Sequence, residues 1–469
     1  MKHRKARIVC TMGPASANRK VISTMVKEGL DVARLNFSHG DYESHKKTLQ
    51  LLREISQKYN QPVSILQDLQ GIKIRTGPFS GGEAELRKGS DVSIFPGSGI
   101  GNGKNVYVSY PSLLRDAKKG DVILLDDGLI QLSVVKKSRK ALTAKVIEGG
   151  IIRDKKGVNF PGMKISLKAF TEKDRKDLEF GLEMNVDYVA ISFVRTADDI
   201  RIIKKWLRER GRNIPIIAKI EKPAAVLNID KILDVSDGIM IARGDLGVEV
   251  SPEKVPLIQK DLIERANIKG KIVITATQML ESMKEHLRPT RAEATDVANA
   301  VIDGTDALML SAETAVGAYP IAAFRMMNRI IRYTEHARKQ TSSYIRGSSY
   351  TGALADAACR ASEDIGAKLL VAFTRSGFTA RLVSKFRPRV PVIAFTPNLE
   401  VLRQMPFYWG VIPKFMKALE NTDQMLREVE KTLINEKLVK KGDRIVIIAS
   451  SPLSTMGKTN FMKLHQIGE

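Results

Sequence analysis

The stretch IPIIAKIEKPAAVLNIDKILDVSDGIMIARGD (residues 214–245) joins two short apolar segments through a helical one. Both apolar segments are rich in β-branched residues, and they end on the acidic residues Glu221 and Asp245. A strand, a helix and a second strand in this order are typical of a βαβ unit, in which the two strands are parallel. The stretch therefore predicts part of a parallel sheet whose carboxyl edge carries charged side chains.

The same unit recurs through much of the chain. Eight apolar runs lie between residues 7 and 313, and their spacing is regular except for one gap between residues 68 and 187. Eight βα units are the number that closes a (β/α)8 barrel, so we expect a TIM barrel. The runs are RIVCTM (7–12), DVARLNF (31–37), VSILQD (63–68), DYVAIS (187–192), IPIIAKIE (214–221), GIMIARGD (238–245), IVITAT (272–277) and ALMLSAE (307–313).

Amphipathic helices are expected between these strands. The segment SPEKVPLIQKDLIERANIKG (251–270) is one example with recognisable ends. Ser251 is the expected N-cap, Pro252 the first helical residue and Gly270 the stop signal.

The gap and the C-terminal part predict two further domains. Residues 71–170 are rich in glycine and alternate as short strands, which predicts an inserted antiparallel β domain, a small barrel or a sandwich. After residue 345, strands and helices alternate again, as expected for an α/β domain with an open sheet. The expected strands are LLVAFT (369–374), PVIAFT (391–396), GVIPKF (410–415) and DRIVIIAS (443–450), with a helix at 423–438.

The fold class is therefore α/β: a (β/α)8 barrel with an inserted small β-barrel domain and a C-terminal α/β open-sheet domain. We expect the catalytic barrel at residues 1–70 and 171–340 and the inserted β lid at 71–170. The C-terminal domain is expected at 345–469, after the polar linker KQTSSYIRGSS (339–349).

Composition narrows the class of protein. Two cysteines, Cys10 and Cys359, can build neither a disulfide framework nor a cysteine metal cluster. No apolar run approaches the roughly 18 residues of a membrane helix, and the basic start MKHRKARIVC lacks the apolar core of a signal peptide. We therefore expect a cytoplasmic protein that does not engage a membrane.

The net charge of +24 attracts polyanions of any kind. The basic residues are scattered and are not interleaved with aromatic ones, and the sequence contains no recognised nucleic-acid-binding motif. Nucleic acid is therefore not an expected partner. A polyanion-binding protein remains the alternative class, and salt-sensitive retention on RNA would favour it.

Polar side chains gather at the predicted carboxyl ends of the strands, where (β/α)8 barrels carry their active sites. Glu221 and Asp245 close adjacent strands, so their carboxylates should lie side by side and suit Mg²⁺. Lys219 lies two residues before Glu221 and shares its face of the strand, where it can neutralise charge on a transferring phosphoryl group. The alternatives are two solvated carboxylates and a lysine held in a salt bridge. The set comprises Thr11, Arg34, Asn36, Asp68, Ser192, Lys219, Glu221, Asp245, Thr277, Ser311 and Glu313.

Glycine-rich segments differ in what they predict. ARGDLG (242–247) follows a strand, and free backbone N–H groups there would cradle a phosphate or carboxylate. Arg34 would add a forked cation suited to phosphate. By contrast, two other glycine-containing segments are not expected to bind a nucleotide. GSGIGNG (97–103) has no helix after it, as a dinucleotide-binding motif requires. PLSTMGKT (452–459) has a proline at the first glycine position of a phosphate-binding loop.

These motifs, in their order and spacing, resemble the pyruvate kinase family over the whole chain. The resemblance implies a barrel, a lid-like β domain inserted after the third strand and a C-terminal α/β domain. It also implies Mg²⁺-dependent phosphoryl transfer from phosphoenolpyruvate to ADP, which gives pyruvate and ATP and is the last step of glycolysis. The nearest alternative enzyme is a Mg²⁺-dependent barrel lyase acting on pyruvate or its enol. The matching segments are TMGPAS (11–16), ARLNFSHG (33–40), DLQGIKIRTG (68–77), KGVNFPG (156–162), AKIEKP (218–223), IARGDLGVE (241–249), TATQMLESM (275–283), RPTRAEATDVANAV (288–301) and LMLSAETA (308–315).

The resemblance also implies a role for each site residue. It makes Glu221 and Asp245 the ligands of one Mg²⁺, while a second Mg²⁺ arrives with the nucleotide. The implied catalytic residues are Lys219, Arg34 and Thr277. The implied substrate-binding residues are Arg34, Lys219, Gly244, Asp245 and Thr277. The implied nucleotide-binding residues are Asn36, Phe37, Ser38, His39, Arg75 and Lys156.

The sequence departs from the family pattern in DLQGIKIRTG, where many relatives read DTKGPEIRTG. The replaced glutamate faces a monovalent cation in potassium-dependent relatives, and here Lys73 stands in its place. The ammonium group of Lys73 can supply that charge, so we expect activity without K⁺. The alternative is that Lys73 points to solvent. The implied cation site consists of Asn36, Ser38, Asp68 and the carbonyl of Leu69.

The C-terminal domain suggests regulation. TRSGFT (374–379) follows a predicted strand and should open a helix, so its hydroxyl and N–H groups suit a phosphorylated effector. TMGKTN (455–460) resembles a second effector loop of allosteric relatives. The alternative is ordinary helix capping by Ser376. The effector-loop candidates are Thr374, Arg375, Ser376, Gly377 and Thr379.

The family resemblance also implies a homotetramer.

Overall fold

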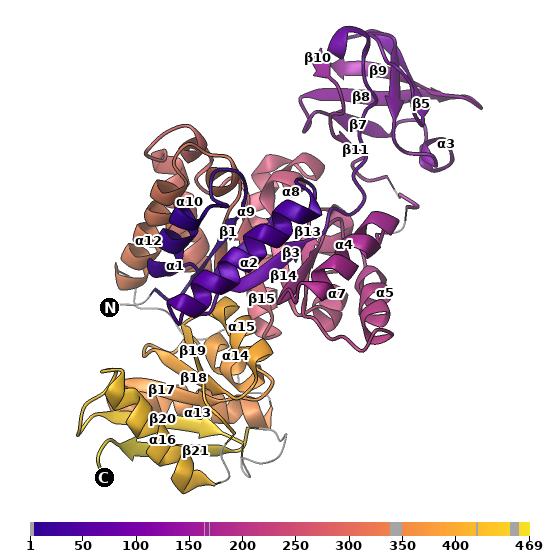
Figure 1. Ribbon diagram of the computed structural model, residues 1–469. Helices are drawn as coiled ribbons and strands as arrows, with labels where there is room; N and C mark the ends of the chain where they lie inside the picture. The colour runs from indigo at the N-terminus through magenta and orange to yellow at the C-terminus, as the bar shows by residue number, and fades with distance from the viewer. Residues whose placement is uncertain (1–3, 164, 168, 338–348, 419–420, 451–458) are drawn as a thin grey trace.

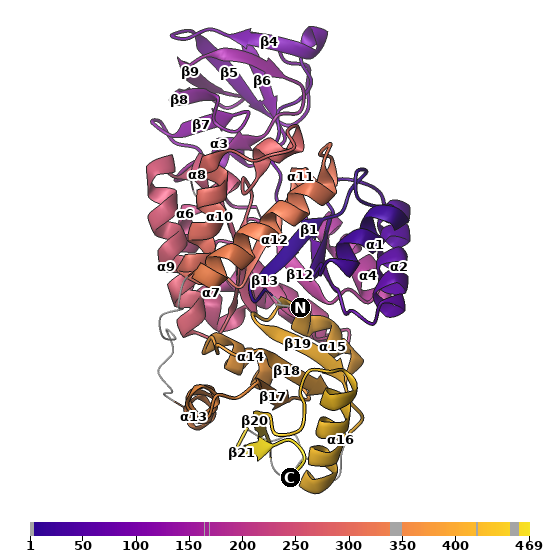
Figure 2. The ribbon, with the colours of Figure 1, turned by 90° about the vertical axis from the view of Figure 1, so that its left-hand side faces the viewer.

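The computed structural model describes residues 4–163, 165–167, 169–337, 349–418, 421–450 and 459–469. Three units follow one another in space, with the insert at the top, the barrel in the middle and the C-terminal domain at the bottom (Figures 1 and 2). Among the helices of these described ranges, none combines the length and the apolar character that crossing a membrane requires.

The barrel is closed by eight parallel strands, which confirms the predicted fold class. Their order around the barrel is β1-β16-β15-β14-β13-β12-β3-β2. The strands are almost continuously buried, because side chains fill the inside of the barrel and helices cover the outside. The strands are β1 (Arg7–Thr11), β2 (Val32–Asn36), β3 (Ser64–Asp68), β12 (Tyr188–Ile191), β13 (Ile216–Ile220), β14 (Gly238–Ala242), β15 (Ile272–Ala276) and β16 (Ala307–Leu310).

Two predicted helix boundaries are wrong. The helix expected at 423–438 spans Thr422–Asn435, and the helix expected after Ser251 begins later. Residues Pro252–Lys254 form a 3-10 turn, and the α-helix begins at Val255 rather than after Ser251. Pro256 explains the shift, because it lacks an N–H and is tolerated only in the first turn of a helix. Gly270 follows the end of the helix with φ +65°, as its stop role predicts. The barrel helices are α1 (Arg19–Lys27), α2 (Tyr42–Lys58), α4 (Glu172–Glu183), α5 (Ala197–Arg208), α6 (Pro223–Leu227), α7 (Ile229–Val235), α8 (Arg243–Glu249), α9 (Val255–Ile268), α10 (Arg291–Asp303), α11 (Ala312–Ala315) and α12 (Pro320–Ala337).

The insert contains a six-stranded sheet, β11-β7-β8-β9-β5-β6, and a two-stranded one, β10-β4. Isolated bridges from Arg75 to Gly157 and from Thr76 to Val108 link the two edges of the larger sheet, so that it curls on itself. Its single apolar core contains Tyr110 and Phe160. The elements are β4 (Glu83–Leu86), β5 (Asp91–Pro96), β6 (Asn105–Val108), α3 (Leu113–Asp116), β7 (Val122–Leu125), β8 (Ile130–Lys137), β9 (Leu142–Glu148), β10 (Gly150–Arg153) and β11 (Val158–Asn159).

The expectation that the insert is antiparallel fails for one pair, since β5 and β6 run parallel. The glycine run 97–103 makes this short crossover possible. Gly97 has φ +98°, and a Cβ on Gly99 would lie 2.4 Å from the Tyr107 ring. The run therefore has a structural role, because only glycine fits this close approach.

The C-terminal sheet has the order β19-β18-β17-β20-β21, and its last strand is antiparallel to β20. We did not predict β21, whose mixed sequence FMKLHQ lies half-buried at the sheet edge. Most of the predicted linker and most of TMGKTN lie outside the described residues. The elements are α13 (Tyr350–Asp364), β17 (Leu369–Phe373), α14 (Phe378–Lys385), β18 (Val392–Thr396), α15 (Leu399–Gln404), β19 (Val411–Phe415), α16 (Thr422–Asn435), β20 (Arg444–Ala449) and β21 (Phe461–Gln466).

Aspartates at the amino ends of the barrel strands fasten the C-terminal domain. Asp187 pairs with Arg403 at 3.0 Å, and Asp306 pairs with Arg387 at 2.9 Å and contacts Lys385. The C-terminal domain thus occupies the amino ends of the barrel strands and leaves their carboxyl ends to face the insert (Figure 2).

Replacing Asp306 by Asn should lower the free energy of unfolding by about 3–5 kcal/mol, because two buried cations lose their counter-charge. Burial lowers the pKa of Lys385 to about 8, and loss of Asp306 lowers it further. Between pH 7 and 8 the folded variant has then released a proton that its unfolded chain keeps, so stability rises with pH. Lys385 of the wild type, with its pKa at about 8, releases only part of its proton over this range, so the stability difference between wild type and variant should shrink.

Urea unfolding at both pH values measures this penalty. The exposed Asp230→Asn variant is the control, since a surface ion pair contributes little. A penalty equal to that of the control would contradict the account.

Candidate active site

Four charged side chains form a buried network at the carboxyl ends of the barrel strands. Arg34 Nε donates to Asp68 Oδ2 at 2.7 Å. Lys219 Nζ lies 3.3 Å from Asp68 Oδ1 and 2.9 Å from Glu221 Oε1, and it donates to Ser192 Oγ at 2.7 Å. The side chains of Asp68 and Glu221 are 1% exposed. Lys219 and Glu221 share one face, as their spacing predicts, and the salt bridge that we held as an alternative is present.

The network fixes the charge of Lys219 and strains that of Glu221. Burial lowers the pKa of Lys219, but the carboxylates of Asp68 and Glu221 raise it more, and the net shift is upward. Burial and the charge of Asp245 raise the pKa of Glu221 against the opposing effect of Lys219. Lys219 is therefore a permanent cation at neutral pH, next to a carboxylate under like-charge strain.

Asp245 does not close a strand, contrary to the prediction. Strand β14 ends at Ala242, and Asp245 lies in the first turn of α8, where the helix dipole favours a negative side chain. The expected free N–H cradle is also partly wrong, because the N–H of Gly244 donates to Thr277 Oγ1 at 2.8 Å. A ligand at this point would have to compete with that hydroxyl.

Thr277 follows β15 with φ +66°, a conformation that is rare for a β-branched residue. Arg243 Nη2 holds it by donating to the Thr277 carbonyl at 2.9 Å. Strain of this kind concentrates at functional sites. The sequence placed Thr277 at a strand end but gave no sign of the strain.

The donor set fits a divalent cation that prefers oxygen. In the described part of the chain no group of three or more His, Cys, Asp and Glu side chains is placed to hold a metal. Mg²⁺ does not need such a group, since it takes one or two carboxylates and fills its other positions with water and substrate oxygens. The like-charge effect of Asp245 on the buried Glu221 is the strain that a bound cation would relieve.

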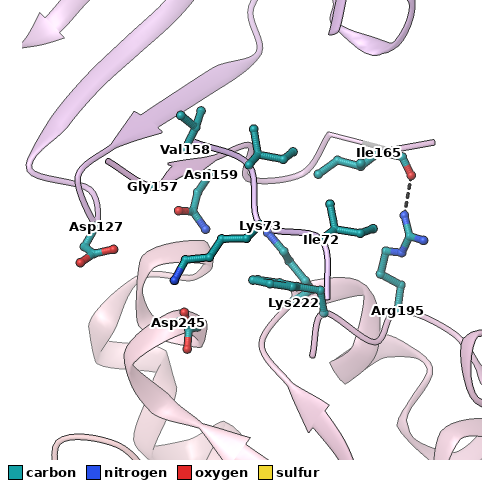
Figure 3. A pocket seen from close by; sticks show the side chains of 12 residues that line it. Ile72, Lys73, Asp127, Gly157, Val158, Asn159, Ile165, Arg195, Lys222 and Asp245 are labelled. Atoms are coloured by element: carbon teal, nitrogen blue, oxygen red, sulfur yellow. Dashed lines mark hydrogen bonds between the residues drawn. The ribbon is translucent and has the colours of Figure 1, made fainter. Parts of the chain in front are cut away.

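A cleft separates the barrel from the insert (Figure 3). Asp245 and Lys222 line its barrel side, and Asp127 and Asn159 line its insert side. Lys73 extends across it with its ammonium group toward Asp245. Burial and the charge of Arg75 lower the pKa of Lys73. The side chain of Lys73 is thus exposed, and it points into the cleft rather than away from the protein. We did not predict Asp127, Asn159 or Lys222, because only the folded chain brings the insert to the barrel mouth.

The expected nucleotide residues divide between two units. Asn36 is the last residue of β2, and Ser38 and His39 lie on the loop after it, where the N–H of Ser38 donates to Asn36 Oδ1 at 3.1 Å. Phe37 is 4% exposed and stacks on His45, so its side chain belongs to the core. Arg75 and Lys156 lie on the insert.

Arg75 Nη1 donates to the Lys155 carbonyl at 3.2 Å, and Lys156 pairs with Asp126 at 2.8 Å. In the expected cation site, the carbonyl of Leu69 accepts from Ser192 Oγ at 2.7 Å.

The expected effector loop connects β17 to α14. Thr374 and Arg375 line a second pocket together with Lys417. Gly377, with φ +81°, is the N-cap of α14, so the alternative that Ser376 caps the helix is wrong. Thr379 Oγ1 lies 2.8 Å from Thr459 Oγ1.

A closed (β/α)8 barrel with buried cations and carboxylates at its mouth, faced across a cleft by a β insert, has the architecture of a barrel enzyme, and its charges suit an anionic substrate and a divalent metal. Residues 3–324 match the family model "Pyruvate kinase, barrel domain", and residues 352–465 match "Pyruvate kinase, alpha/beta domain". The chain belongs to the pyruvate kinase family and is a phosphotransferase that uses phosphoenolpyruvate and ADP. Membership of this family excludes the alternative of a Mg²⁺-dependent barrel lyase.

Individual relatives agree with the family models. The pyruvate kinase of Staphylococcus saprophyticus is 44% identical over 99% of this chain and 81% of its own length. That of Staphylococcus aureus strain MRSA252 is 43% identical with the same coverage. The crystal structure of a pyruvate kinase from Cryptosporidium parvum superposes with a TM-score of 0.93 at 38% identity, covering 99% of this chain and 96% of the other.

Proposed function

We propose that phosphoryl transfer from phosphoenolpyruvate to ADP, the last step of glycolysis, takes place beside Lys219. The observation that carries this proposal is the contact of Lys219 Nζ with Asp68 and Glu221 in a buried network. A coupled assay for pyruvate tests it: pyruvate must form only when phosphoenolpyruvate, ADP and Mg²⁺ are all present.

Each residue at the mouth has a distinct task. Glu221 and Asp245 would hold one Mg²⁺, which supplies charge neutralisation and a template for phosphate oxygens. Lys219 and Arg34 face the phosphoryl group and stabilise its charge as the bond to the enol oxygen breaks and the bond to the ADP oxygen forms. Gly244 and Thr277 hold the substrate. The enolate carbon then takes up a proton, which gives pyruvate.

The nucleotide would lie between the barrel loop 36–39 and the insert, with a second Mg²⁺. Arg75 and Lys156 bring positive charge from the insert side, which suits the phosphates of ADP. Closure of the insert would exclude water, which otherwise competes for the phosphoryl group. We propose the domain bounds expected from the sequence: the catalytic barrel at 1–70 and 171–340, the insert at 71–170 and the regulatory domain at 345–469. We also propose a cytoplasmic homotetramer.

We expect K⁺ to be dispensable. The ammonium group of Lys73 points toward Asp245 and adds a fixed positive charge to the cleft that holds the substrates. Rates in K⁺-free and K⁺-containing buffer should agree within about twofold, while the Lys73→Glu variant should require K⁺. Lys140→Glu, an equal charge change on the exposed surface of the insert, is the control. Strong activation of the wild type by K⁺ would contradict the assignment.

The pocket beside Thr374 and Arg375 should bind a phosphorylated effector, since Lys417 and Arg375 bring two cationic side chains to its lining. Sugar phosphates and nucleotides at millimolar concentration should shift the phosphoenolpyruvate concentration at half-maximal rate. Arg375→Ala should abolish that shift without changing the unstimulated rate. Indifference of the wild type to all these phosphates would refute the effector site.

A further inference from the structure

The insert is tied to the barrel by a buried carboxylate. Glu249 is the last residue of α8, and its side chain is 1% exposed. Its Oε1 accepts a hydrogen bond from Asn159 Nδ2 of the insert at 2.7 Å, and the same oxygen contacts Lys222 Nζ of the barrel. One barrel carboxylate therefore binds a cation of its own unit and an amide of the other. We call these three side chains the Asn159–Glu249–Lys222 latch.

The barrel partners of the latch adjoin the proposed metal ligands. Lys222 directly follows Glu221, and Glu249 lies one helical turn after Asp245 on the short helix α8. Lys222 pairs with Glu249 inside the barrel, so the barrel alone compensates the buried carboxylate that accepts the hydrogen bond from the insert.

The insert partner of the latch adjoins the proposed nucleotide residues. Asn159 lies three residues after Lys156 on the strand that faces the barrel, and Figure 3 shows its side chain directed toward the barrel. Gly157, between them, bridges to Arg75. Fixing Asn159 therefore fixes the backbone that carries both cationic side chains of the insert.

From this geometry we propose that the latch sets the position of the insert over the barrel mouth and thereby the affinity for ADP. In this proposal Asn159 and Glu249 are positioning residues, which act on the nucleotide through Arg75 and Lys156. The effect on ADP rests on the proposed function, whereas the effect on the position of the insert does not.

A reciprocal exchange tests the latch. Asn159→Asp places a second carboxylate against Glu249, and like charges at hydrogen-bond distance repel. Combining Asn159→Asp with Glu249→Gln restores one amide and one carboxylate at the same place. We expect Asn159→Asp to raise the KM for ADP by about tenfold, the equivalent of one lost buried hydrogen bond. The double variant should return close to the wild-type KM. The KM for phosphoenolpyruvate and the urea midpoint should stay within about twofold of wild type throughout.

The position of the insert is measured separately, without substrates. Ile100 on the insert and Leu227 on the barrel are 69% and 87% exposed, and both native cysteines are buried, so Ile100→Cys and Leu227→Cys accept spin labels selectively. Asn159→Asp should shift or broaden the distance distribution, and the double variant should restore it. Glu253→Gln, on the exposed turn after α8, is the matched control.

Three outcomes would overturn the proposal. An unchanged distance distribution in Asn159→Asp would show that the latch does not set the position of the insert. A shifted distance distribution with an unchanged KM for ADP would show that the position of the insert does not set the affinity for ADP. A raised KM that the double variant does not reverse makes the effect one of local packing. Failure of the proposed function itself is distinguishable, since the wild type would then form no pyruvate while the distance measurement remained valid.

Discussion

Lys219→Met should lower kcat by about 10³-fold or more while the KM for phosphoenolpyruvate changes only a few-fold. Methionine keeps much of the volume of the side chain but removes the charge that faces the migrating phosphoryl group. A cation that acts chiefly in the transition state contributes to kcat far more than to ground-state binding, and for phosphoryl transfer such a cation accounts for about 10³–10⁵-fold in rate. The steady-state rates of the purified variant measure the effect.

The control is Lys231→Met, the same substitution on the exposed face of α7, which should leave the rate unchanged. Removing Lys219 also leaves Asp68 and Glu221 without their shared cation, so the urea midpoint must be recorded alongside the rate. Lys219→Arg keeps the charge and should retain the fold. More than a tenth of wild-type kcat in a folded Lys219→Met variant would contradict the proposed role.

Glu221→Gln should raise the Mg²⁺ concentration needed for half-maximal activity by about 100-fold or more. The amide keeps the shape of the carboxylate but is a poor ligand for a hard cation, and even supporting residues around a metal change its affinity by about 10–100-fold. Varying Mg²⁺ at saturating phosphoenolpyruvate and ADP measures the effect. Glu264→Gln on the exposed face of α9 should leave the requirement unchanged. An unaltered Mg²⁺ requirement in Glu221→Gln would remove this carboxylate from the metal site.

The barrel and the core of its site follow from local patterns in the sequence. Apolar runs that end on polar residues locate the ends of the barrel strands to within three residues, and a two-residue spacing places Lys219 beside Glu221. The start of α9 was mispredicted because Pro256, not Pro252, sets it. Asp245 was assigned to a strand because a short helix that begins on a glycine-containing turn has little pattern of its own.

Other features depend on contacts between distant parts of the chain. The bond from Asn159 to Glu249 spans 90 residues in the sequence, and neither residue marks its partner. The strained backbone of Thr277 is held by a hydrogen bond from Arg243, which lies 34 residues earlier at the start of α8. The edge strand β21 carries too mixed a pattern to be separated from a loop.

The central claim is that the carboxylates of Glu221, directly after β13, and of Asp245, in the first turn of α8, grip one divalent ion next to the ammonium group of Lys219. A crystal of the protein soaked with Mn²⁺ and phosphoenolpyruvate, measured at the manganese absorption edge, tests it most directly. The account predicts one anomalous peak within bonding distance of both Glu221 and Asp245, with Lys219 on the phosphate of the substrate. A manganese ion bound elsewhere, with Glu221 and Asp245 both free of metal, would contradict it.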